Sequence, residues 1–152
     1  QEVGQSIVEE DMFTPAKDLN DKIVLPQDFM VLESTGQTSI RPASGIEKAD
    51  FILDIGPKTT ADFIKIIEKA GSVLWNGPMG KFEDKNGSAG TEAIARAIAG
   101  CSGQTLAGGG ETVAIIEQLG LVKKIGFVSV GGGALLTNLA GGPMPALDAL
   151  KK

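Results

Sequence analysis

The sequence predicts an α/β fold in three αβα layers, with a mainly parallel sheet between helices. Two observations lead to this class. From Asp50 onward, apolar runs of strand length alternate with longer segments in which apolar residues recur at helical spacing. Two glycine triplets, 108–110 and 131–133, each stand between an apolar run and a segment of helical pattern. Strands that alternate with helices favour right-handed crossovers and a parallel sheet covered on both faces.

Length and composition restrict the kind of protein. A chain of 152 residues can bury one core, and we expect residues 1–152 to belong to one domain. The absence of histidine excludes a histidine-based catalytic triad and histidine metal sites. The net charge of −5 argues against binding to nucleic acid or to an anionic membrane surface. No apolar run approaches the roughly 20 residues that span a bilayer, and no signal peptide is visible. Cys101 is the only cysteine, which excludes an internal disulfide and fits the reducing cytoplasm.

The elements before Asp50 are the least regular. Thr14 followed by Pro15 is typical of a helix start, so a short helix is expected through about Asn20. The apolar run in residues 22–26 predicts a strand, and Gly36 indicates a hairpin in a polar stretch.

After Asp50 the elements follow one another regularly. A strand at 51–53 precedes a helix from about Thr60, which we expect to end at Gly71. The next strand, 72–75, leads into the loop 76–80 and then into a helix. Ser88 caps that helix, the pair Glu92 and Arg96 supports it, and Gly100 ends it.

The Asn76 loop and both glycine triplets are expected at one edge of the sheet, because ligands of parallel sheets bind beyond the carboxyl ends of the strands. Glycine lets other atoms approach the backbone closely, and a helix that starts there directs free N–H groups and its positive dipole end outward. Two such junctions suit a polyphosphate, although a single triplet is also typical of a tight turn. The dinucleotide fingerprint is absent, and Trp75 and Phe82 stand where a P-loop needs glycine and Ser or Thr.

Glu111 has two interpretations. A carboxylate at a helix N-terminus complements the helix dipole by about 0.3–1 kcal/mol, which needs no ligand. A carboxylate that faces bound phosphates would be repelled unless a cation intervened, and Mg²⁺ shared between them removes that conflict. The neighbouring Thr112 either caps the first turn or offers its N–H or hydroxyl to a phosphate.

Other residues near the loop have similar alternatives. Glu83 can accept two ribose hydroxyls or stand as a solvated charge, and Lys81 can meet phosphate or stand in solvent. Trp75 can stack on a base, but its place in an apolar strand favours core packing. With no histidine available, Cys101 is not expected to be a catalytic thiol.

Taken in order, these segments resemble the phosphoglycerate kinase family, specifically the later part of its C-terminal, nucleotide-binding domain. The block Trp75-Asn76-Gly77-Pro78-Met79-Gly80 is the most specific, and the glycine triplets support it. The resemblance spans nearly the whole chain, through residues 3–11, 53–59, 73–83, 108–112, 128–134 and 145–150.

The resemblance implies a Rossmann-like domain and a role for each matching residue. Asn76 and Pro78 would line the nucleotide cleft, and Glu83 would bind the ribose hydroxyls. Glu111 would stand where the family has an aspartate linked to Mg²⁺, which accompanies ADP or ATP. The phosphates would be held by Gly109, Gly110 and Thr112, and the phosphoryl group in transfer would lie near Gly110, Gly132 and Gly133.

The implied reaction is the glycolytic, cytoplasmic transfer of a phosphoryl group between 1,3-bisphosphoglycerate and ADP, which gives 3-phosphoglycerate and ATP. Those phosphoglycerates would bind the family's N-terminal domain. Neither that domain nor the start of the C-terminal domain has a counterpart in this sequence. The chain begins at Gln1 rather than at methionine, so upstream sequence is expected. Because Arg41 and Arg96 are the only arginines, the usual cationic clamp is missing and this piece is expected to be inactive alone. The alternative is a non-catalytic nucleotide-binding or interaction module derived from this domain.

Several residues depart from the family pattern. Glu111 replaces aspartate, and its extra methylene would place water between the carboxylate and the metal. Ile52, Lys81 and Val130 replace a glycine, a small apolar residue and a threonine. The missing strands would also leave a sheet edge and apolar surface exposed.

Overall fold

The structure is a computed structural model that describes residues 2–8 and 19–150. It divides into two compact units. Unit 1 contains the chain up to Phe63 together with Met79–Thr91, and unit 2 contains Ile64–Pro78 together with Glu92 onward. The α/β class predicted from the sequence is confirmed, while the single domain over residues 1–152 stays a prediction.

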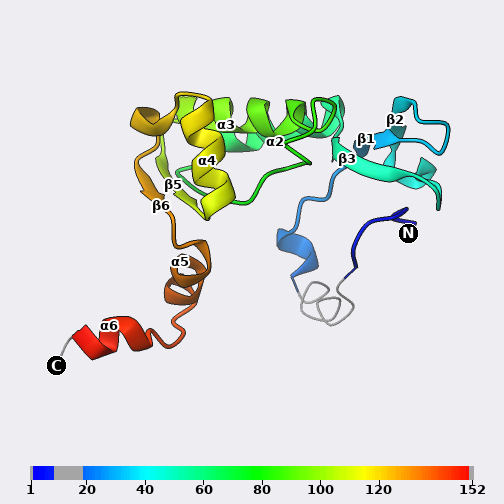
Figure 1. Cartoon of the computed structure of the whole chain (residues 1–152). Helices are drawn as coiled ribbons and strands as arrows, with labels where there is room; N and C mark the ends of the chain where they lie inside the picture. Colours follow the sequence, from blue (N-terminus) through cyan, green and yellow to red (C-terminus); the bar gives the residue numbers. More distant parts are fainter. Residues whose placement is uncertain (1, 9–18, 151–152) are drawn as a thin grey trace. The chain divides into compact units, whose positions relative to one another are not determined.

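Unit 1 is built on a small antiparallel sheet with the strand order β2-β1-β3. Its strands are β1 (Asp28–Leu32), β2 (Thr38–Pro42) and β3 (Phe51–Ile55), which Figure 1 draws in blue to cyan. The hairpin expected at Gly36 is confirmed, since Gly36 lies between β1 and β2 with a φ of 82°. The strand expected at 51–53 is present as β3, but it pairs antiparallel. The short hairpin makes β1 and β2 antiparallel, because parallel pairing needs a longer crossover connection. Strand β3 also pairs antiparallel with β1, at the edge of β1 opposite to β2.

The strand expected at 22–26 is wrong. Residues Asn20–Lys22 form a 3₁₀ turn, and the first strand begins only at Asp28. The apolar side chains of Ile23, Val24 and Leu25 are exposed and pair with no strand of the described chain. Pro26 lacks the N–H that a ladder needs. The helix expected from Thr14 to Asn20 lies almost entirely outside the described residues.

Helix α2 (Pro57–Glu68) is anchored in unit 1 by Asp28 of β1. The two carboxylate oxygens of Asp28 accept the N–H groups of Lys58 at 3.0 Å and Thr59 at 2.8 Å. The Thr59 hydroxyl also donates to this carboxylate, at 2.6 Å. Burial acts to raise the pKa of Asp28, but these hydrogen bonds outweigh it and the pKa lies below the ordinary value of 3.8. A side chain distant in sequence therefore caps the helix, which begins at Pro57 rather than near Thr60.

Unit 2 contains the parallel sheet, in the order β4-β5-β6. Its strands are β4 (Ser72–Asn76), β5 (Gln104–Gly108) and β6 (Phe127–Ser129). Each lies where the sequence predicts an apolar strand. The helices that precede or follow these strands, drawn in Figure 1, are α3 (Ala89–Gly100), α4 (Gly110–Gln118), α5 (Gly132–Leu139) and α6 (Pro145–Leu150).

The two faces of this sheet differ. Trp75 and Ala107 are neighbours across β4 and β5 on a buried face, and they are 3% and 0% exposed. On the other face Leu74, Leu106 and Phe127 form one row across the three strands, and Leu74 and Phe127 are exposed. This row is apolar surface of the kind that the sequence led us to expect.

No helix among the described residues is long and apolar enough to cross a membrane.

We expect Asp28→Asn to lower the free energy of unfolding by about 1–2 kcal/mol at pH 7, because the cap of α2 loses its charge. Since the folded pKa of Asp28 is lowered, its contribution is present above pH 3.8 and is lost as the pH falls through the folded pKa. The difference in free energy of unfolding between wild type and variant should therefore become smaller in acid. Urea unfolding at pH 7 and near pH 3 measures it, with the exposed Asp21→Asn as control. A difference in free energy of unfolding that does not change with pH would contradict this account.

Candidate functional site

The candidate site lies in unit 2, where the three parallel strands end. Asn76, Gly108 and Ser129 are paired in register, so they form one row across the carboxyl ends of β4, β5 and β6. The N–H of Gly109 continues this row by donating to the Ser129 carbonyl at 3.0 Å. The Asn76 loop and both glycine triplets thus meet at the carboxyl ends of the strands, where the sequence predicted the ligand to bind.

The two triplets approach each other backbone to backbone. A Cβ added to Gly132 would lie 2.6 Å from the Cα of Gly109 and 3.0 Å from the Asn76 amide nitrogen. A Cβ added to Gly108 would lie 2.7 Å from the Leu135 side chain of α5. Gly109 itself has a φ of 100°, which disfavours any side chain. Gly108 and Gly132 are therefore required by packing and Gly109 by its backbone conformation, and the resulting wall of the site consists of bare peptide groups.

Two helices begin at this wall. The Val113 N–H donates to the Gly109 carbonyl, and the Leu135 N–H donates to the Gly131 carbonyl. In α4 the N–H groups of Gly110, Glu111 and Thr112 therefore precede the first bond of the helix. The first turns of α4 and α5 give this edge positive electrostatic potential without a lysine or an arginine.

The loop after β4 is tied to α4 through Thr112. The Gly77 N–H donates to the Thr112 hydroxyl oxygen at 2.8 Å, and the Trp75 indole N–H donates to the Gly77 carbonyl at 2.7 Å. Thr112 is fully buried, so its visible role is to hold this loop, and its contact with phosphate stays a prediction. Trp75 packs in the core, as its strand position favoured, and does not offer its ring to a base.

The remaining predicted residues differ in exposure. Asn76, Gly110, Glu111 and Gly133 are exposed, Pro78 and Gly109 are half-buried, and Gly132 is buried. Space is open around Gly110 and Gly133, because a Cβ at either would meet nothing within 4 Å. Glu83 is exposed in a loop of unit 1. The structure thus brings Asn76, Gly109, Gly132 and the start of α4 together, whereas Glu83 belongs to the other unit.

A metal would have to be bound here by one carboxylate. Among the described residues no three of the acidic, cysteine or histidine side chains gather into a metal site. Glu111 is exposed in the first turn of α4, beside the open backbone of Gly110. Mg²⁺ commonly binds through one carboxylate, phosphate oxygens and water, so this donor set fits Mg²⁺ that arrives with a phosphate ligand.

Sequence reasoning missed two supports of the site. Gly77, with a φ of 85°, turns its N–H toward Thr112, and Leu135 of α5 packs against Gly108. Glycine at position 77 was a visible signal for a strained turn. The partner of each residue could not be read from the sequence, because both contacts join segments far apart in the chain.

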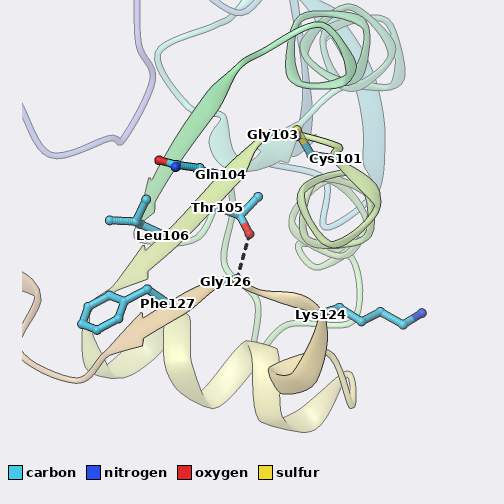
Figure 2. Close-up of a pocket in the computed structure, with 8 residues that line it drawn as sticks. All are labelled: Cys101, Gly103, Gln104, Thr105, Leu106, Lys124, Gly126 and Phe127. Carbon is cyan, nitrogen blue, oxygen red and sulfur yellow. Dashed lines mark hydrogen bonds between the residues drawn. The ribbon is translucent and has the colours of Figure 1, made fainter.

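A hollow of about 440 Å³ lies at the opposite end of the sheet, where β5 and β6 begin. Figure 2 shows the Thr105 hydroxyl at its centre, where it accepts the Gly126 N–H at 2.9 Å, while Lys124 extends away from Leu106 and Phe127. The Cys101 sulfur donates to the Ile67 carbonyl at 3.3 Å, a packing contact rather than that of a nucleophile. None of the residues predicted for the site lines this hollow, which is bordered by Cys101, Gly103, Gln104, Thr105, Leu106, Lys124, Gly126 and Phe127.

Comparisons with known proteins agree on one family. The family model described as phosphoglycerate kinase matches residues 1–142. A phosphoglycerate kinase of Vibrio campbellii is 38% identical over 98% of this chain and 40% of its own length. One of Buchnera aphidicola is 40% identical over 99% of this chain and 40% of its own length. This chain thus spans about 40% of the length of these relatives.

Solved structures give the same result. Phosphoglycerate kinase of Coxiella burnetii superposes with a TM-score of 0.85 at 31% identity, over 97% of this chain and 41% of that one. The enzyme of Pyrococcus horikoshii gives a TM-score of 0.79 at 32% identity, over 93% of this chain and 36% of that one. The glycine-built edge, the family match over residues 1–142 and these superpositions lead to one conclusion: the chain belongs to the phosphoglycerate kinase family.

Proposed function

We propose that this chain is the nucleotide-binding part of a phosphoglycerate kinase. It binds ADP or ATP together with Mg²⁺ at the carboxyl ends of β4, β5 and β6. In the complete enzyme this site serves the reversible transfer of a phosphoryl group between 1,3-bisphosphoglycerate and ADP, which gives 3-phosphoglycerate and ATP in cytoplasmic glycolysis. Family membership supports the reaction, and the geometry of the strand ends supports the place of the nucleotide.

The observation that carries the proposal is the packing of Gly132 on Gly109 beside Asn76. It leaves two helix starts next to each other with no side chain between their backbones. Backbone N–H groups at helix starts bind phosphate well, because they donate hydrogen bonds and carry the positive end of the dipole. A nucleotide diphosphate matches this arrangement in charge.

Each predicted site residue has a role that follows from its chemistry. Asn76 and Pro78 border the nucleotide, and Glu83 accepts the ribose hydroxyls. Gly109 and Gly110 hold phosphate oxygens. Thr112 is buried, so it contributes to phosphate binding by fixing the shape of the turn at Gly77. Glu111 holds Mg²⁺, which when bound neutralises phosphate charge.

The transferring phosphoryl group is stabilised by position rather than by covalent chemistry. Backbone near Gly110, Gly132 and Gly133 lies where the two helix starts meet, so its N–H groups favour negative charge at that point. Gly110 and Gly133 have open space around them, which leaves room for a ligand. The packing fixes the wall in advance, so little rearrangement is needed when charge moves.

We further propose that the chain alone does not catalyse the transfer. Phosphoryl transfer depends on cationic groups around the reacting phosphate. Arg41 is engaged in unit 1 by Glu33, Glu47 and Asp50, at 3.2, 2.7 and 3.3 Å, and the other arginine, Arg96, lies in the middle of α3. The phosphoglycerate site then belongs to the part of the relatives that this chain does not match.

Calorimetric titration of ADP, with and without Mg²⁺, into the 152-residue chain tests the proposal together with a coupled kinase assay. We expect saturable binding of MgADP and no turnover. Absence of ADP binding would refute the nucleotide site, and turnover would refute the inactivity. Binding that is unchanged by every substitution at the glycine wall would instead favour an interaction module that holds nucleotide elsewhere.

We expect Gly132→Ala to lower the free energy of unfolding by about 1–3 kcal/mol, because the new methyl would overlap the Gly109 backbone. ADP affinity should fall with it, since the two helix starts must move apart. Gly71→Ala is the matched control, as a Cβ there meets nothing within 4 Å. Urea unfolding and calorimetry measure both quantities. If Gly132→Ala behaves like Gly71→Ala, the close backbone approach is wrong.

We expect Glu111→Ala to weaken MgADP binding by about tenfold or more, which corresponds to about 1.4 kcal/mol. Metal-free ADP should change little or bind slightly better, because a negative charge near the phosphates is removed. Glu117→Ala, an exposed glutamate on the same helix, is the control. Equal losses for both forms of ADP would show that Glu111 does not act through Mg²⁺.

A further inference from the structure

The chain contains the dipeptide Asn-Gly twice, at residues 76–77 and 86–87. Asparagine followed by glycine is especially open to spontaneous deamidation, because glycine has no side chain to keep its nitrogen away from the asparagine side chain. The pair Asn76-Gly77 belongs wholly to unit 2, where Asn76 is the last residue of β4 and is exposed. Its exposed side chain and its glycine neighbour make Asn76 a candidate site of chemical modification.

Deamidation consumes water and releases ammonia. The backbone nitrogen of Gly77 loses its proton to solvent and bonds to the Cγ carbon of Asn76. The Cγ–Nδ2 bond then breaks, and the departing nitrogen takes up a proton and leaves as ammonia. Water opens the resulting cyclic imide at either carbonyl, which gives aspartate or isoaspartate at position 76. The reaction therefore requires a Gly77 nitrogen that can lose its proton and reach Cγ.

The structure holds Gly77 at both its N–H and its carbonyl. The N–H donates to the hydroxyl oxygen of Thr112 at 2.8 Å, and the carbonyl accepts the indole N–H of Trp75 at 2.7 Å. Thr112 is 0% exposed and lies in the first turn of α4, and Trp75 is 3% exposed. An N–H that donates to a buried acceptor is harder to deprotonate, since the acceptor would lose its partner.

The Asn76 side chain lies against the glycine wall. Its amide nitrogen would be 3.0 Å from a Cβ added to Gly132 and 3.4 Å from one added to Gly108. Asn76 is also paired with Gly108 in the parallel ladder. The imide can close only if the Gly77 N–H leaves Thr112 and the nitrogen turns toward this side chain.

The second pair, Asn86-Gly87, belongs to unit 1 and has a different restraint. The Gly87 N–H donates at 2.8 Å to the carbonyl of Asp84, which is a bond within a local turn. The bond from Gly77 to Thr112 instead joins positions 35 residues apart. Asn86 is exposed and its restraint does not involve Thr112, so it serves as an internal reference.

We propose that Asn76 is a deamidation site that the hydrogen bond from the Gly77 N–H to the Thr112 hydroxyl keeps closed in the folded chain. Opening of this bond sets the rate of modification. The inference does not depend on the proposed function, because it needs only contacts within unit 2. Its consequence is electrostatic: an aspartate at position 76 adds a negative charge beside the starts of α4 and α5, where the helix dipoles attract anions.

Mass spectrometry of tryptic peptides tests the inference, because residues 70–81 and 86–96 form separate peptides with one asparagine each. In the wild-type 152-residue chain we expect Asn76 to deamidate at least about tenfold more slowly than in the isolated peptide 70–81. Thr112→Val removes the acceptor and should raise the rate at Asn76 by about tenfold, while the rate at Asn86 stays unchanged. Thr112→Ser keeps the acceptor and should resemble the wild type.

Thr105→Val is the matched control. The buried Thr105 hydroxyl also accepts a glycine N–H in unit 2, that of Gly126 at 2.9 Å (Figure 2). Its loss should leave the rate at Asn76 unchanged. Equal rates at Asn76 in the wild type and in Thr112→Val would overturn the inference, as would an acceleration by Thr105→Val as large as that by Thr112→Val.

A second measurement needs no variant and covers the case in which Thr112→Val does not fold. As urea is added to the wild type below its unfolding transition, amide hydrogen exchange at Gly77 and deamidation at Asn76 should become faster in parallel. Deamidation that accelerates while the Gly77 N–H stays protected would refute the role of this bond. Deamidation of Asn76 in the folded wild type as fast as in the peptide 70–81 would refute it as well.

Discussion

The close contact between the backbone of Gly132 and that of Gly109 is the constraint on which the candidate site depends. It can form only where residue 132 has no side chain, because a Cβ there would overlap the Gly109 backbone, and it brings the start of α5 against the loop before α4. The in-register pairing of Asn76, Gly108 and Ser129 supplies the platform, because it ends three parallel strands at one level. The positive potential of the site then arises from peptide dipoles that packing has already oriented.

Unit 1 uses buried carboxylates for a different purpose. Asp28 and Asp54 both accept backbone N–H groups at or near the starts of helices, α2 and α3 respectively. Their pKa values move in opposite directions, because hydrogen bonds outweigh burial at Asp28 and burial outweighs hydrogen bonds at Asp54. Each carboxylate joins a strand to a distant segment. These two residues fix the starts of α2 and α3 to the small sheet of unit 1.

The two faces of the parallel sheet in unit 2 are covered unequally. One face buries Trp75 and Ala107, whereas the row on the other face leaves Leu74 and Phe127 exposed. A parallel sheet normally has both faces covered. The glycine-built wall needs only the three strands and two helix starts that this chain contains, so it forms within unit 2 itself.

The sequence by itself determined the α/β class, the strands of unit 2, the helix starts at the glycine triplets and the family. These features depend on local periodicity and on glycine, whose conformational consequences are local. Tertiary structure decided that Phe51–Ile55 pairs antiparallel, that residues 22–26 are not a strand, and that Thr112 is buried beneath Gly77. It also decided the roles of Asp28 and Asp54. The pairing of β3 and the contacts of Thr112, Asp28 and Asp54 each depend on a partner distant in the chain, and no local pattern specifies which partner that will be. Residues 22–26 find no strand partner in the described chain, which their apolar run does not reveal.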